Sequence, residues 1–482
     1  MKRTQLTCLL AFIVAVLGGA GDIRAANTFY VGPRGSDRTG DGSPNRPWAT
    51  IRHATDTVPD DGSTILLMDG LYMGTQSVNR HFRKQCVVRA MNPYRARFRG
   101  LPSANRVFYC YDGSNVKIQG LEIFGSGGTA SEYLIHVSRP QTHHLIFQDC
   151  IVHDCYTNDT IKINAFAHHI VFSGCVFANP ENRPGREHFD VNMVTDVTIE
   201  DSIFFNDFAG SGRPAANNSH SFIVIKNSGR TPNVTQRITL RRNVFLNWEG
   251  LPDQAYVLLG EDGKPFMEAQ QVLIENNLFI FNSPNPFWGA FLLKGGLQDV
   301  AIRANTVVGH PVHGKTGRFA GLLLRIEQNP PMGNMRMCNN IWCDPSGRMP
   351  RFCYGPADLF APGSRQTMRN NLFWNGGQPV PSEQRHVFDP AHDPAGRTAD
   401  PQLADPSQGV VLPRWDPARA KFLSSETTIR GEFTRLVNAY AALGAGSAAI
   451  DAAEAMNMPD HDILGRSRDA KPDIGCFEKG AK

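Results

Sequence analysis

Charged and polar side chains recur at matching positions of short apolar segments in the first half of the chain. When “YLIHVS”, “TIKINA”, “HFDVNM” and “FIVIKN” are aligned, one position reads His136, Lys162, Asp190 and Val224. The position two residues later reads Ser138, Asn164, Asn192 and Lys226, and later copies place Lys294 and Arg325 there. A lysine beside an aspartate, amides and a histidine can bind a carboxylate, hold a metal ion or move a proton.

Alternation along these segments assigns a face to each side chain. If Val137, Ile163 and Val191 point to the core, both columns point outward. The opposing interpretation is a solvated face of alternating charges, and a register error of one residue would turn every side chain over. On the functional interpretation we assign catalysis to Lys162, His188 and Lys226, substrate contacts to His136, Asn164, Lys294 and Arg325, and metal ligation to Asp159, Asp190 and Asn192.

Lys162 is the expected base of this patch, and Asp190, Asp159 and Asn192 would offer oxygen ligands to Ca²⁺. Asp190 should raise the pKa of a neighbouring lysine, so a bound cation has to offset this effect. As an exposed strand residue, Lys162 should contribute little packing, and Lys162→Ala should leave the melting temperature nearly unchanged.

A second constellation consists of His144, His169 and Asp196, each just before an apolar segment. Stacked on consecutive turns of a repeat, they could hold zinc or another divalent ion. The interpretation we favour is a polar ladder of turn residues.

A repeat provides the frame for both constellations. Eight segments, from “LIFQDCIV” to “QTMRNNLF”, share the pattern apolar-x-apolar-x-x-(Cys, Ser or Asn)-x-apolar, at spacings of 25 to 41 residues. Such spacings are typical of solenoids. The sixth position reads Cys150, Cys175, Ser202, Asn243, Asn277, Asn305, Asn340 and Asn371.

The asparagine column predicts a parallel β-solenoid. Equivalent residues of successive coils lie about 4.8 Å apart, and an amide carries both donors and an acceptor, so stacked asparagines can bond one another. With the second apolar segment of each copy, every coil should contain at least two strands. Loops of variable length would project from one edge.

This pattern resembles the secreted right-handed parallel β-helix proteins of the pectate-lyase-like group. The opening stretch, “FYVGPRGSDRTGDGSPNRPWATIRHA”, is similar to the N-terminal cap of that group. The resemblance implies an all-β, single-stranded right-handed parallel β-helix over residues 63–374, a cap over 27–62 and a C-terminal tail with a short helix over 375–482. Proteins of this group include polysaccharide lyases, hydrolases, epimerases and non-catalytic adhesins. The motifs that define pectate lyases proper and polygalacturonases are absent from this sequence.

Composition and the N-terminal segment limit the kinds of partner that we expect. Residues 1–26 have the basic start, apolar run and small-residue end of a signal peptide, which predicts secretion to the periplasm or the cell exterior. Their removal takes away three basic side chains and one acidic side chain, and leaves a net charge of about +2 from the +4 of the whole chain. We therefore expect no nucleic-acid partner and no membrane contact, and we expect a monomer.

Cysteine is too sparse for a disulfide scaffold. Free thiols are expected for Cys150 and Cys175, whereas Cys343–Cys353 or Cys86–Cys110 are better candidates for a bridge.

The leading hypothesis is a lyase that cleaves an acidic, uronic-acid polysaccharide by β-elimination with Ca²⁺. The alternatives are a carbohydrate-binding or surface protein without activity, and a glycoside hydrolase or epimerase on the same fold.

Overall fold

The computed structural model describes residues 27–127, 132–214, 218–283, 285–310, 312, 322–324 (backbone only), 332–349, 351–353 and 360–480. The predicted signal peptide and Arg325 lie outside the described residues. Within them, no helix is both long and apolar enough to cross a membrane.

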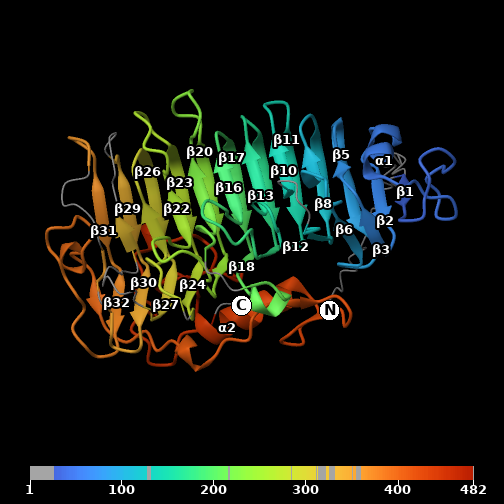
Figure 1. Ribbon diagram of the computed structural model, residues 1–482. Coiled ribbons are helices and arrows are strands. Elements are labelled where there is room, and N and C mark those ends of the chain that lie inside the picture. Colours follow the sequence, from blue (N-terminus) through green and yellow to red (C-terminus); the bar gives the residue numbers. More distant parts are fainter. Residues whose placement is uncertain are drawn as a thin grey trace, which may run out of the picture.

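Three parallel sheets form the wall of the molecule (Figure 1). The first contains, in spatial order, β1 (Thr28–Val31), β2 (Thr64–Leu67), β5 (His81–Ala90), β8 (Ser114–Gln119), β11 (His143–Gln148), β14 (His168–Ser173), β17 (Thr195–Glu200), β20 (Gln236–Arg241), β23 (Ala269–Glu275), β26 (Leu297–Arg303), β29 (Met335–Cys338) and β31 (Gln366–Arg369).

The second sheet carries the polar columns. It runs β28 (Leu322–Leu324), β25 (Phe291–Leu293), β22 (Val257–Leu259), β19 (Ile223–Lys226), β16 (Phe189–Asn192), β13 (Ile161–Asn164), β10 (Tyr133–Ser138), β7 (Arg106–Cys110) and β4 (Gln76–Ser77).

The third sheet follows the asparagine turn. It runs β3 (Gly70–Met73), β6 (Ala96–Arg99), β9 (Glu122–Phe124), β12 (Ile151–His153), β15 (Val176–Ala178), β18 (Ile203–Phe205), β21 (Val244–Phe245), β24 (Leu278–Phe281), β27 (Thr306–Gly309), β30 (Ile341–Asp344), β32 (Leu372–Asn375) and β33 (Arg397–Thr398).

Each complete coil thus contributes one strand to every sheet, as β10, β11 and β12 do. This arrangement confirms the predicted parallel β-helix and specifies three strands per coil.

The asparagine ladder is buried and continuous. The Nδ2 of each asparagine donates to the Oδ1 of the next, at 3.0, 2.9, 3.0 and 2.9 Å along Asn243, Asn277, Asn305, Asn340 and Asn371. The carboxylate of Asp393 ends the ladder and accepts from Asn371 Nδ2 at 2.7 Å. The residue before each ladder position has a positive φ, for example 54° at Asn276 and 56° at Asn339, which bends the chain sharply between the first and third sheets.

The two ends of the β-helix are covered differently. At the N-terminal end, α1 (Ile51–Thr57) buries Ile51 and Ala54, and the Trp48 ring stacks on Phe29 with centroids 5.4 Å apart. The C-terminal tail instead runs back along the outer face of the third sheet (Figure 1). There the short hairpin of β34 (Trp415–Asp416) and β35 (Lys421–Phe422), α2 (Ile429–Tyr440) and the segment that follows pack on that sheet in a second apolar cluster.

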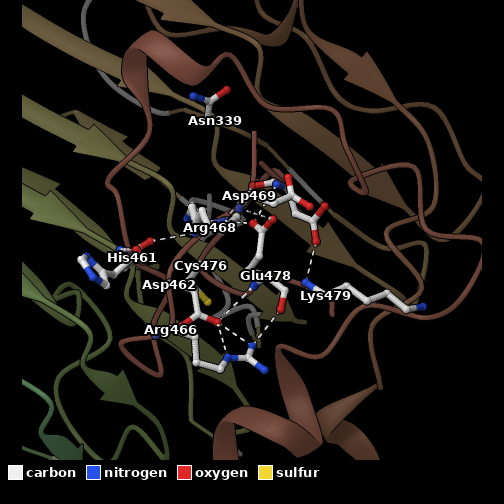
Figure 2. Close-up of polar contacts among 12 residues, drawn as sticks. Asn339, His461, Asp462, Arg466, Arg468, Asp469, Cys476, Glu478 and Lys479 are labelled. Carbon is white, nitrogen blue, oxygen red and sulfur yellow. Dashed lines mark hydrogen bonds and ion pairs between the residues drawn. The ribbon is translucent and has the colours of Figure 1, made fainter. Parts of the chain in front are cut away.

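Hydrogen bonds join the tail to the coils, one of them from an arginine of a buried ion pair within the tail. Arg468 Nη1 lies 2.8 Å from Glu478 Oε2, and Arg468 Nη2 donates to Asn276 Oδ1 at 3.0 Å. Cys476 N donates to Thr306 Oγ1 at 3.1 Å. Figure 2 shows Arg468 and Glu478 with the neighbouring polar residues of the tail. The tail therefore closes the third sheet and leaves the outer face of the second sheet for a site.

Candidate active site

The two polar columns lie on the outer face of the second sheet in the predicted register. His136 pairs with Lys162, Lys162 with Asp190, and Asp190 with Val224. In the neighbouring column, Asn164 pairs with Asn192 and Asn192 with Lys226. The alternation inferred from the sequence is therefore correct over these coils.

The charged residues form a tight cluster on β13, β16 and β19. Lys162 Nζ bonds Asp190 Oδ2, and Lys226 Nζ bonds Glu261 Oε2 and lies 3.8 Å from the same Asp190 oxygen. Only 14% of each lysine side chain is exposed. The expected open patch is thus a mostly buried ion-pair network, and the expectation that Lys162 is an exposed strand residue is wrong.

Three carboxylates meet beside the lysines. One oxygen from each of Asp159, Glu187 and Asp190 lies within 4.8 Å of the others, and all three residues are buried. Asp159 Oδ1 accepts a hydrogen bond from Glu187 N at 3.2 Å. Asp190 Oδ1 is buried and has no hydrogen-bond partner within the described part of the chain.

The pKa values within this trio reflect burial and mutual repulsion. Burial, together with the charges of Glu187 and Asp190, raises the pKa of Asp159 well above its ordinary value. Burial and the charge of Asp190 raise the pKa of Glu187 to about 7. Burial alone would lower the pKa values of Lys162 and Lys226, but the charge of Asp190, with those of Asp159 and Glu261 respectively, outweighs this effect and raises both. Both amines are consequently protonated near neutral pH.

A histidine, His220, lies between Glu187 of the trio and Glu261. His220 Nδ1 lies 3.1 Å from Glu187 Oε1, outside hydrogen-bond alignment, and its Nε2 lies 3.4 Å from Glu261 Oε1. Burial lowers the pKa of His220. His220, Glu187 and Glu261 lie in the segments between strands, where no periodic pattern marks them, and sequence reasoning missed all three.

The remaining predicted site residues separate into two groups. His136 and Asn164 belong to the site: His136 Nε2 lies 3.2 Å from Asn164 Oδ1, and burial lowers the pKa of His136 to about 4. The Asn192 amide is engaged by Ser228: its Nδ2 donates to Ser228 Oγ at 2.6 Å, and its Oδ1 accepts from Ser228 N at 2.9 Å. The carboxylate beside Asp159 and Asp190 that was not predicted is Glu187.

The environment of His188 differs from the one expected for a catalytic residue. Its ring packs on Phe204 and Phe222, its Nε2 lies 2.9 Å from Asn206 Oδ1, and burial lowers its pKa to about 3. Among the described residues, no hydrogen bond or ion pair connects it to the charged cluster, so it is unsuited to the predicted catalytic role. Lys294 lies at the far side of the cluster, partly exposed, and contributes positive charge near His220 and Glu261.

The histidine constellation is a turn ladder. Asp196 is engaged by Arg237 through both oxygens, at 2.7 and 2.8 Å, and lies 3.9 Å from His169 Nδ1. His144, His169 and Asp196 share φ values of 52°, 55° and 57°. The polar-turn interpretation therefore accounts for these residues.

The predicted disulfides are also corrected. Cys86, Cys110 and Cys343 are buried free thiols, as are Cys150 and Cys175, for which free thiols were expected. Among the residues that the structure describes, no disulfide joins Cys86 to Cys110 or includes Cys343.

Comparisons with known proteins support the architecture. No protein-family model matches the chain, and no curated protein sequence matches it. Among solved structures, a pectate lyase, Pel9A, superposes over 95% of this chain and 98% of its own, with a TM-score of 0.53 and 14% identity.

Two further solved structures are similar. A complex of XylC with xylose covers 94% of this chain and 99% of its own, with a TM-score of 0.51 and 11% identity. A glycoside hydrolase covers 72% of this chain and 96% of its own, with a TM-score of 0.52 and 9% identity. The chain thus has the parallel β-helix fold that these three proteins share.

Proposed function

We propose that the protein is a secreted, polysaccharide-active β-helix that cleaves an acidic, uronic-acid polysaccharide by β-elimination. The observation that carries the proposal is the meeting of three buried carboxylates with two lysines on the outer face of one sheet. This combination supplies both a cation site and a candidate base, which β-elimination next to a carboxylate requires.

The residues present fit Ca²⁺. Asp159, Glu187 and Asp190 offer oxygen ligands within 4.8 Å of one another, and oxygen is the donor that Ca²⁺ prefers. The buried Asp190 Oδ1 accepts no hydrogen bond from any residue that the structure describes, which leaves one acceptor for an ion. A cation held there would withdraw charge from the substrate carboxylate and acidify the adjacent C–H bond.

Lys162 is the proposed base. It would take the proton from the carbon next to the carboxylate while the bond to the leaving oxygen breaks, a carbon–carbon double bond forms and the leaving oxygen is protonated from water. Lys162 must first lose its own proton, and the pKa raised by Asp190 and Asp159 opposes this. A cation bound by these carboxylates would offset their charge and let the pKa of Lys162 fall, so the cation-free protein should be inactive.

Lys226 would remain protonated and hold a substrate carboxylate, with Lys294 further along the face. Because Lys226 bonds Glu261 and lies close to Asp190, it is positioned as a fixed positive charge.

A second function, glycoside hydrolysis, is favoured by one observation. Glu187, with a pKa of about 7, lies beside Asp190. A protonated carboxyl and a nearby carboxylate are the acid and base of many glycosidases.

The test is incubation with polygalacturonate and alginate, with Ca²⁺ or with a chelator. β-Elimination produces ultraviolet absorbance from the new double bond together with new reducing ends, whereas hydrolysis produces reducing ends alone. Lys162→Arg is the matched variant, since arginine keeps the charge beside Asp190 but cannot deprotonate. Unimpaired cleavage by Lys162→Arg would remove Lys162 from the mechanism, and binding without either product would favour a binding module.

A further inference from the structure

Aromatic and basic side chains continue the outer face of the second sheet toward the N-terminal coils. They come from β7, from β10 and from the turns that follow these strands, and we call them the arginine–tyrosine platform: Arg106, Tyr109, Tyr111, Tyr133 and Arg139.

The platform arginines are held by rings and not by carboxylates. Arg106 Cζ lies 5.0 Å from the ring centroid of Tyr111 and 5.7 Å from that of Tyr109, and Arg139 Cζ lies 5.3 Å from that of Tyr111. Among the described residues, no carboxylate pairs with Arg106 or Arg139, and Arg106 Nε is buried without a hydrogen-bond partner. Within this part of the chain, the charges of the half-buried Arg106 and the exposed Arg139 are therefore not neutralised by an acidic side chain.

The platform is continuous with the charged cluster through His136. Tyr111 Oη lies 2.7 Å from His136 Nδ1, and the Tyr133 ring centroid lies 4.9 Å from that of His136. His136 pairs with Tyr109 on one side and Lys162 on the other. Tyr109 and Lys162 are thus two strands apart, about 10 Å at ordinary strand spacing.

In the opposite direction, the outward column that contains Lys162 is buried. Val224, Leu258 and Leu292, which follow in the outward column, are excluded from solvent and cluster with Ala255 and Trp288. Because these side chains are buried, a charged polymer cannot contact them, and in that direction Lys294 of the neighbouring column is partly exposed. The aromatic and basic side chains extend the cluster in the other direction, over β10 and β7.

We propose that the arginine–tyrosine platform is a binding site for the segment of an acidic polysaccharide on the N-terminal side of the cluster. Guanidinium groups bind sugar carboxylates through paired, charge-assisted hydrogen bonds. The partly exposed tyrosine rings offer apolar surface to the C–H faces of the sugar rings. This inference rests on the acidic substrate of the proposed function, but it does not depend on the reaction.

The test is equilibrium binding of a defined oligogalacturonate and of a neutral xylo-oligosaccharide, measured by calorimetry with Ca²⁺ present. The Arg106→Gln/Arg139→Gln double variant should bind the acidic oligosaccharide at least about tenfold more weakly than the wild type does. Added salt should reduce this difference in affinity between the two proteins. Arg89→Gln, an exposed arginine of β5 on the first sheet, is the matched control and should bind as the wild type does.

Failure of this inference is distinguishable from failure of the proposed reaction. If no polymer is cleaved but the double variant loses acidic binding, the platform stands without the lyase. If the wild type cleaves the polymer and the double variant keeps the same KM and affinity, the platform is overturned. Equal weakening by Arg89→Gln, or no binding of the acidic oligosaccharide by the wild type, would overturn it too.

Discussion

Replacement of Lys162 by methionine is the sharpest test of the buried cluster. Methionine is also a long, unbranched side chain, so the change mainly removes the positive charge. The partner, Asp190, has a side chain that is only 5% exposed, and it lies close to Asp159 and Glu187. Without Lys162, this carboxylate would be a poorly compensated charge among other acids.

The size of the effect follows from the geometry. Removal of one partner of a buried ion pair costs about 3–5 kcal/mol. Lys226 Nζ remains 3.8 Å from the same Asp190 oxygen and supplies part of the lost compensation. We therefore expect the free energy of unfolding to fall by about 3 kcal/mol, the lower end of that range.

The assay is urea denaturation followed by circular dichroism, with comparison of midpoints at constant slope. Lys162→Arg retains the charge and should lose much less, and the double variant Lys162→Met/Asp190→Asn should recover most of the loss, since the stranded charge is gone. A loss below about 0.5 kcal/mol, the size typical of surface substitutions, would show that water solvates these side chains and that the cluster is not buried.

Three other predictions concern the frame. Asn305→Ala should lower the free energy of unfolding by about 1–3 kcal/mol, because it leaves the buried Asn277 N–H without an acceptor and removes the bonds to Asn340 and Ile274. Asn92→Ala, at an exposed position, is the control, and a melting temperature of Asn305→Ala equal to that of the wild type would contradict the ladder. Burial lowers the pKa of His153, but Asp154 and Glu122 raise it more, to about 9. The protonated histidine therefore contributes its full stabilisation below pH 6.5. The free energy of unfolding should then fall by about 1–3 kcal/mol as the pH rises to 9. His153→Gln should flatten that pH profile in urea titrations, and an unchanged slope would exclude His153. A truncation that begins at Gly62 should aggregate in light scattering, because it uncovers β2 and the apolar end of the core; a soluble monomer that melts cooperatively would refute the capping role of the deleted segment.

The sequence predicts the coils well because their physical constraints are periodic. Alternation of inward and outward residues places His136, Lys162 and Asp190 in register, and the asparagine column marks one turn of every coil. The third strand of each coil was not separated, because strands such as Ile151–His153 follow the ladder residue directly and are only three residues long. A pattern of period two cannot separate so short a strand from the segment before it.

The candidate site was only partly predictable. Glu187, His220 and Glu261 lie in segments without periodicity, where spacing along the chain says nothing about spacing in space. Burial was misjudged for a related reason. Outward-facing residues of one sheet are covered by the segments between strands, and coverage depends on tertiary contacts that alternation does not encode.

Charge balance explains why a cation and a proton both suit the same place. Four carboxylates, Asp159, Glu187, Asp190 and Glu261, surround Lys162 and Lys226, so full ionisation would leave two negative charges in excess in a nearly dry environment. Such an excess is costly unless protons or a cation neutralise it. The raised pKa values of Asp159 and Glu187 are the outcome when only protons are available. A divalent ion carries the two positive charges that those protons supply, and its binding would leave both lysines close to carboxylates already engaged. The hydrolase and lyase interpretations thus correspond to two ways of neutralising one cluster, which is why the product of the reaction, and not the fold, distinguishes them.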